Sequence, residues 1–222
     1  MQIAIYQVDA FADRLFAGNP AAVCPLDEWL EDGLLRQIAM ENNLSETAFF
    51  VADAERVDHF SLRWFTPDAE VDLCGHATLA SAFVIFNSQD FVGDALHFHT
   101  RSGDLTVTRD ECGALCMELP AGPASEIAGD EAVRIADSVE AALGHRPLEV
   151  HRAVNLLAVF DSEKTLRALR YSAALAPALE AAATWGLIAT APAAPDTGVD
   201  FVSRFFAPLK ALGEDPVTGS AH

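Results

Sequence analysis

The sequence FSLRWFTP at residues 60–67 recurs as FVSRFFAP at residues 201–208. The first, fourth, sixth and eighth positions agree, and each copy leads to a glycine-containing turn, DLCGHA at 72–77 and DPVTGSA at 215–221. Matches in register followed by similar turns favour an internal duplication over chance similarity of two aromatic strands. Two duplicated halves would form a pseudo-two-fold pair whose turns can face each other across a cleft, which is a common place for a site.

The run HATLASAFVIF at 76–86 follows the first of these turns and is apolar on nearly every side. A helix with this pattern is buried on all sides, so we expect a central helix near 76–87 in an N-terminal half spanning 1–120. We expect the second half to span 130–222 and to be cut short where its own central helix would begin. Because strands without that helix would be left uncovered, we expect the natural product to continue past His222, or another element to supply the helix.

Strand and helix patterns alternate along the rest of the chain, which predicts an α+β fold. A stretch rich in proline, glycine, serine and alanine at 121–129 is the best linker in the chain. Helices are expected at 27–43 and 131–143, with one or two more over 165–183 that are interrupted near Pro177. Strands are expected at 1–9, 21–25, 47–52, 60–66, 96–100, 105–108, 115–119, 152–160 and 185–190.

The charge balance excludes whole classes of partner. The 222 residues include 14 Lys and Arg against 33 Asp and Glu, a formal net charge of −19, which opposes binding to nucleic acid or to an anionic membrane surface. A small anion would instead be held locally, by one or two arginines or by backbone N–H groups at a helix start. No leader and no long apolar run is visible, and four cysteines are too few for a disulfide scaffold, so we expect a cytoplasmic protein with reduced thiols. No Cys/His spacing matches a zinc site.

Two residues of the N-terminal half are candidates for proton chemistry. Glu46 lies between the end of a predicted helix and an apolar strand, and burial there would raise its pKa toward the range that a general acid/base needs. The alternative is that Ser45 or Glu46 caps an element at the surface. His76, beside Gly75, could donate to an anionic substrate or relay protons, or it could simply cap the buried helix.

The remaining candidates each have two interpretations. Asp215 and Ser220 fit a turn residue and an N-cap as well as a site. Arg63 and Arg204 could bind a substrate anion or pair with acidic neighbours. Cys74 could be a nucleophile or a proton-transfer thiol, but Thr218 stands at the matching place in the second copy, so a two-thiol racemase is excluded. With no nucleotide-binding or metalloprotease motif, a cofactor-independent reaction remains.

Five ordered motifs carry a resemblance that extends from the first strand to the last residue. They are VDAF at 8–11 with GNP at 18–20, NLSETAF at 43–49, RWFTP at 63–67, LCGHAT at 73–78 and EDPVTGSAH at 214–222. The sequence thereby resembles the phenazine-biosynthesis PhzF-like isomerase family. The resemblance implies a diaminopimelate-epimerase-like fold, with two pseudo-symmetric domains, each a curved sheet around a central helix, and the site in the cleft between them. It also implies a homodimer and no metal or organic cofactor.

The resemblance assigns roles to residues already singled out. It implies that Glu46 is the proton-transferring acid/base, that His76, Asp215 and Ser220 hold and polarise the substrate, and that the backbone at Gly75/His76 and Gly219/Ser220 receives its carboxylate. The predicted function is a proton shift in a small carboxylate-bearing substrate, which could be cyclic. Two alternatives stay open: a single-thiol epimerase or racemase using Cys74, and a non-catalytic protein that binds small acids.

Overall fold

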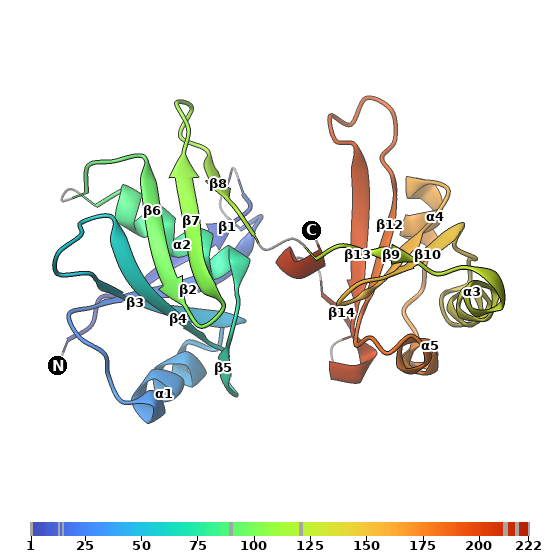
Figure 1. Cartoon of the computed structure of the whole chain (residues 1–222), viewed down its shortest axis with the longest axis horizontal. Coiled ribbons are helices and arrows are strands. Elements are labelled where there is room, and N and C mark those ends of the chain that lie inside the picture. The colour runs from blue at the N-terminus through green and yellow to red at the C-terminus, as the bar shows by residue number, and fades with distance from the viewer. Residues whose placement is uncertain are drawn as a thin grey trace. The chain divides into compact units, whose positions relative to one another are not determined.

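The computed structural model describes residues 2–12, 14, 16–88, 91–119, 122–210, 213–215 and 218–221, with the backbone alone for Lys210 and Ser220. The chain divides into two compact units, Met1–Pro120 and Ala121–His222. Each unit has its own sheet (Figure 1). Each unit also has its own hydrophobic core.

The first unit is a mixed sheet curled around one helix. Over the described residues its strand order is β1-β2-β3-β4-β6-β7-β8, with β5 paired to β4. Helix α2 (Gly75–Phe86) contacts β1, β2 and β3 and also β8, at opposite ends of that order. The sheet therefore curls around α2, which explains why the run at 76–86 is apolar on nearly every side. The strands are β1 (Tyr6–Ala10), β2 (Asn19–Leu26), β3 (Glu46–Ala52), β4 (His59–Phe65), β5 (Glu70–Val71), β6 (Ala95–Thr100), β7 (Gly103–Arg109) and β8 (Leu115–Met117).

A second helix, α1 (Asp32–Asn42), packs outside this core and precedes β3 in the chain. Its Leu35 and Ala39 join Phe49 and Phe65 in a separate hydrophobic cluster. The helix ends at Asn43, which has the left-handed conformation (φ 49°) and donates its backbone N–H to the carbonyl of Ala39. Asparagine tolerates this conformation better than most residues, and the reversal places the following residues at the start of β3.

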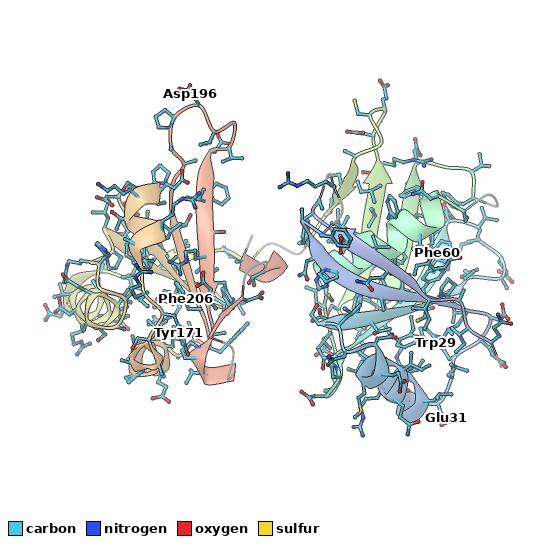
Figure 2. The ribbon with its side chains drawn as sticks, turned by 180° about the vertical axis from the view of Figure 1, so that it is seen from behind. Trp29, Glu31, Phe60, Tyr171, Asp196 and Phe206 are labelled. Carbon is cyan, nitrogen blue, oxygen red and sulfur yellow. The ribbon has the colours of Figure 1, made fainter. Side chains whose placement is uncertain are left out.

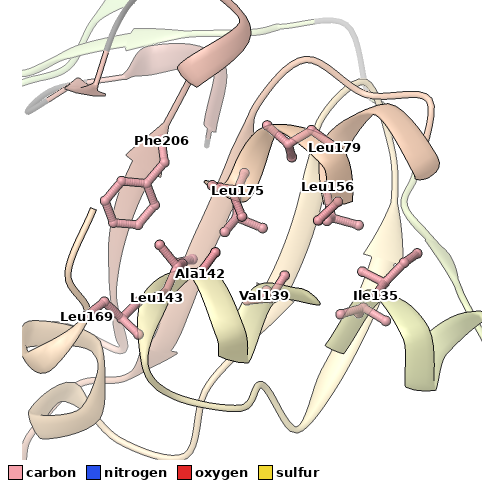
Figure 3. Packing of buried hydrophobic residues seen from close by; sticks show 14 of the residues in the cluster. Ile135, Val139, Ala142, Leu143, Leu156, Leu169, Leu175, Leu179 and Phe206 are labelled. Atoms are coloured by element: carbon pink, nitrogen blue, oxygen red, sulfur yellow. The ribbon is translucent and has the colours of Figure 1, made fainter. Parts of the chain in front are cut away.

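The second unit is a sheet with helices on one face. Its described strands are ordered β14-β13-β12-β11-β10-β9, and β11 and β12 run parallel. Figure 3 shows side chains of helices and strands meeting in its core, with Val139 and Leu143 on one side and Leu156 and Phe206 on the other. The strands are β9 (Ser125–Glu126), β10 (Glu149–Arg152), β11 (Leu156–Val159), β12 (Leu187–Pro192), β13 (Phe201–Phe206) and β14 (Glu214–Asp215); the helices are α3 (Gly129–Leu143), α4 (Glu163–Ala168), α5 (Ala176–Ala181) and the 3₁₀ turns Ala173–Leu175, Pro208–Lys210 and Gly219–Ala221.

Side chains alternate across this sheet, so its strands have two apolar faces. Leu187 and Phe206 belong to the helix-covered core, whereas Ile188 and Phe205 form a small cluster on the opposite face. Tyr171 stacks on Phe206, with ring centroids 6.3 Å apart (Figure 2). The opposite face carries an open groove of about 460 Å³ along β11, β12 and β13. That a central helix belongs to this half stays a prediction.

Two expectations from sequence are wrong in this unit. The strand expected over 152–160 is not continuous: it begins at the last residue of β10, turns back at 153–155 and continues as β11, which is antiparallel to β10. The helical stretch at 165–183 breaks after Ala168, at 169–172, rather than near Pro177. Pro177 instead lies in the first turn of α5, where its missing N–H costs no helical hydrogen bond. Of the helices in the described part of the chain, none combines the length and apolar character of a bilayer-spanning segment.

Candidate active site

Glu46 is the first residue of β3, a few residues after the end of α1. Its side chain is 20% exposed, so the carboxylate is largely withdrawn from water and still reachable. The Oε2 atom is buried and makes no hydrogen bond of normal geometry with any described residue, although Nε2 of His76 lies 3.2 Å away. The alternative that Glu46 caps an element at the surface does not fit this position.

His76 is the second residue of α2, and its ring lies between two other polar groups. The residue is 6% exposed. Its Nε2 is 3.2 Å from Oε2 of Glu46 and 3.5 Å from Oγ of Ser45, and its Nδ1 is 3.4 Å from Sγ of Cys74. The start of β3 and the start of α2, which are far apart in sequence, thus bring a carboxylate, an imidazole and a thiol together.

The thiol of Cys74 is held in its protonated form. Burial raises its pKa well above the usual range, and the negative charge of Glu46 raises it further. The backbone N–H groups of Ala77 and His76 act in the opposite direction, but they do not offset the burial. A thiolate nucleophile needs a lowered pKa, so the environment of Cys74 disfavours that chemistry.

The N-terminus of α2 lies beside these three side chains. Cys74 is extended (φ −146°, ψ 103°), the helix begins at Gly75, and no described side chain caps the first turn by a hydrogen bond of normal geometry. The first N–H groups of a helix have no intrahelical partner, and the helix dipole favours an anion there. A Cβ at position 75 would approach Cε of Met117 to 3.3 Å, so a larger residue would crowd this end.

The site residues predicted from the second half lie in the second unit. Asp215 is in β14, opposite Phe205 of β13, and Gly219 begins the 3₁₀ turn Gly219–Ala221. The backbone of Ser220 is in the same turn, and its side chain lies outside the described residues. The grouping of Asp215, Gly219 and Ser220 with Glu46 and His76 in one site stays a prediction.

The two arginines of the repeat are engaged with acidic neighbours. Arg63 pairs with Glu70 and Asp32, and Arg204 pairs with Glu214. Of the two interpretations that the sequence allowed, the structure supports the ion pair over substrate binding.

Sequence reasoning also missed the association of Cys74 with Glu46, because the two residues come from different motifs and no local spacing connects them.

Comparisons with known proteins agree with this architecture. The family model described as "Phenazine biosynthesis-like protein" matches residues 8–222. An uncharacterized isomerase of Pseudomonas aeruginosa is 48% identical over 222 residues, covering 100% of this chain and 80% of that protein. The crystal structure of a PhzF family phenazine biosynthesis protein from Enterococcus faecalis has 42% identity and a TM-score of 0.84, covering 100% of this chain and 80% of that one.

The fold is shared more widely than the sequence. A hydroxyproline epimerase from Agrobacterium vitis superposes with a TM-score of 0.55 at 8% identity, covering 96% of this chain and 72% of that one, which shows a common fold alone. These two curved sheets are therefore the epimerase-like fold that the motifs imply. The family match over nearly the whole chain and the close relatives lead to one conclusion: the chain belongs to the phenazine biosynthesis-like family of PhzF-like isomerases.

Proposed function

We propose that this protein catalyses a proton shift within a small carboxylate-bearing substrate, without a cofactor, and that Glu46 is both the acid and the base. The observation that carries the proposal is the 3.2 Å approach of Oε2 of Glu46 to Nε2 of His76, in a largely buried position beside the start of α2. A carboxylate held in this way is withdrawn from bulk water and remains reachable, as proton transfer to and from carbon requires.

The reaction balances without any other reactant. Glu46 takes a proton from one substrate carbon, so that a C–H bond breaks, an O–H bond forms and the electron pair moves into the adjacent unsaturated system. The protonated Glu46 then returns the proton to another carbon of the same system. The product has the same formula as the substrate, so the reaction is an isomerisation. Glu46 recovers its original charge and is ready for another turnover.

The position of the α2 N-terminus supports a place for the substrate carboxylate. Helix α2 begins at Gly75, and a helix N-terminus favours an anion, so on the strength of the family motif we assign the substrate carboxylate to the backbone at Gly75 and His76. We assign Asp215, Gly219 and Ser220 to the other side of the substrate on the strength of the family motif. His76 holds the carboxylate of Glu46 in position and polarises the substrate.

The alternatives are weaker on physical grounds. A single-thiol epimerase would need Cys74 as a thiolate, and burial together with the charge of Glu46 keeps it protonated. A non-catalytic binder of small acids would use the same α2 N-terminus but would show no exchange of carbon-bound protons.

Solvent exchange separates these functions. Proton NMR in deuterated buffer can follow proton exchange in a panel of small cyclic and acyclic carboxylates, including a dihydro-hydroxyanthranilate. Wild type should exchange or isomerise at least one of them. Glu46→Gln, which keeps the size of the side chain but cannot act as a base, should lower the rate by roughly 10²–10⁴.

The matched control is Glu41→Gln, which makes the same chemical change at an exposed residue of α1 and should leave the rate unchanged. Wild-type turnover in Glu46→Gln would end the assignment of Glu46. Saturable ligand binding without exchange would favour the non-catalytic binder, and exchange that is lost in Cys74→Ser but kept in Glu46→Gln would favour the thiol epimerase.

A further inference from the structure

Three different metal-ligating groups converge at the site. One ligand atom each from Glu46, Cys74 and His76 lie within 4.8 Å of one another, and within the described part of the chain no other set of three such residues does so. The donors are a carboxylate oxygen, a sulfur and an imidazole nitrogen. This mixture suits Zn²⁺ and related divalent cations, whereas Mg²⁺ and Ca²⁺ prefer oxygen ligands alone.

The distances are close to those of a tetrahedral zinc site. With Zn–S of about 2.3 Å and Zn–N of about 2.0 Å, a tetrahedral ion holds sulfur and nitrogen roughly 3.5 Å apart. Sγ of Cys74 and Nδ1 of His76 are 3.4 Å apart. A ligand atom of Glu46 lies within 4.8 Å of those of Cys74 and His76, so its side chain would have to change conformation to bring an oxygen to the same ion.

Burial and access are both suitable. Cys74 and His76 are 7% and 6% exposed, so the packing around α2 already fixes their side chains. Metal binding would therefore cost little additional conformational entropy. The side chain of Glu46 is 20% exposed and leaves a route for an ion from solvent. Its Oε2 is a buried acceptor that receives no hydrogen bond of normal geometry from any described residue, and a cation would satisfy it.

We propose that Glu46, Cys74 and His76 bind one Zn²⁺-class divalent cation, with water at the fourth position, and that this cation inhibits the enzyme. The inhibition rests on the proposed function, because an ion that ties up the carboxylate of Glu46 stops it from accepting a proton. Binding replaces the S–H bond of Cys74 by a bond from sulfur to the metal, and the thiol proton passes to solvent. No electrons are transferred.

Cobalt(II) makes the site visible without any substrate. The experiment uses the full chain with Cys112→Ser and Cys116→Ser, which removes the two exposed thiols that would bind metal on their own. Titration with Co²⁺ should give a thiolate-to-cobalt charge-transfer band that saturates at one equivalent, and Zn²⁺ should remove the band by displacement. A titration without this band would overturn the proposal.

Variants show which residues hold the ion. Cys74→Ser should abolish the charge-transfer band, while Cys24→Ala, at the other buried cysteine, should retain it. Glu46→Gln and His76→Asn should each weaken Co²⁺ binding by at least about 10–100-fold, the range typical even for loss of residues behind the ligands. Circular dichroism checks that each variant is folded, and a band that survives in folded Cys74→Ser would contradict the assignment.

The inhibition is measured separately once a substrate turns over. Zn²⁺ should abolish proton exchange and a chelator should restore it. Full activity of the zinc-loaded protein would overturn the inhibitory role. If no carboxylate exchanges under any condition, the proposed function fails, and the metal site is judged by the cobalt band alone.

Discussion

Arg204 donates two hydrogen bonds to Glu214, from Nε to Oε1 at 2.6 Å and from Nη2 to Oε2 at 2.7 Å. The same arrangement recurs in the first unit, where Nε and Nη2 of Arg63 donate to the two carboxylate oxygens of Glu70, both at 2.8 Å. In each unit the arginine also lies over the phenylalanine two positions later in the same strand. The two copies of the repeat, at 60–67 and 201–208, therefore share a set of side-chain contacts as well as a sequence, which supports the duplication.

Removing Arg204 should destabilise the second unit. Its Nη1 also donates to the carbonyls of Leu166 and Leu169, both at 2.9 Å, so Arg204→Ala leaves those carbonyls and Glu214 without this partner. We expect a loss of about 1–3 kcal/mol, measured by the urea midpoint of unfolding. Arg167→Ala is the control, because that side chain is 76% exposed and its pair with Glu163 should contribute at most about 0.5 kcal/mol. Equal effects of the two substitutions would contradict this account.

The Arg204–Glu214 pair should also make stability depend on pH. The hydrogen bonds from Arg204 lower the pKa of Glu214 in the folded protein. A carboxyl with a lowered folded pKa stabilises the fold above its unfolded pKa of about 4.3, and this contribution is lost as the pH falls through the folded value. Glu214→Gln should therefore be less stable than wild type at neutral pH, and the difference should shrink below about pH 4. Urea titrations across this range test the sign, and a difference that grows in acid would refute it.

Thiol reactivity should follow burial. Cys112 and Cys116 are exposed, whereas Cys24 and Cys74 are buried, and burial raises the pKa of Cys24 to about 12 and also raises that of Cys74. Since the thiolate is the reactive form, a brief exposure of the native protein to iodoacetamide should label Cys112 and Cys116 only. Mass spectrometry of peptides reads the result, with the denatured protein as the control for complete labelling. Rapid labelling of Cys74 would revive the single-thiol mechanism.

Local patterns in the sequence were sufficient for the elements that hold the site. The apolar run at 76–86 is α2 almost residue for residue, and the position of Glu46 between a helix and a strand is as expected. Those patterns failed where a short turn interrupts an apolar stretch, as at 153–155, because hydrophobicity does not reveal a reversal of direction.

The proximity of Cys74 to Glu46 could not be predicted from local patterns either. It depends on how the first sheet curls around α2, and this curl brings the start of β3 next to the start of the helix. The motifs assign each residue a separate role, whereas the distances connect them through His76. The metal site inferred above is a property of that tertiary arrangement.

Gly186 should be intolerant of any side chain, although it lies just before β12 and not in a turn that requires a positive φ. A Cβ there would lie 2.4 Å from Cζ of Phe205 and 3.1 Å from Oδ1 of Asn155, and both residues are buried. Because Phe205 packs edge-on against Trp185, with ring centroids 5.3 Å apart, its ring cannot move without disturbing a second aromatic residue. Gly186→Ala should therefore cost about 1–3 kcal/mol, as overpacking usually does.

The matched control for Gly186→Ala is a glycine substitution that should raise the free energy of unfolding instead of lowering it. A Cβ on Gly33, near the start of α1, would meet no described atom within 4 Å, so Gly33→Ala should stabilise the first unit by about 0.4–1 kcal/mol through the unfolded chain. Calorimetry should then show two separate changes. Gly186→Ala should lower the transition of the second unit by roughly 4–8 °C for each kcal/mol lost, and Gly33→Ala should raise that of the first. If Gly186→Ala left the transition temperature of the second unit unchanged, Phe205 and Trp185 would have to move together at little cost. This face of the second sheet would then be loosely packed.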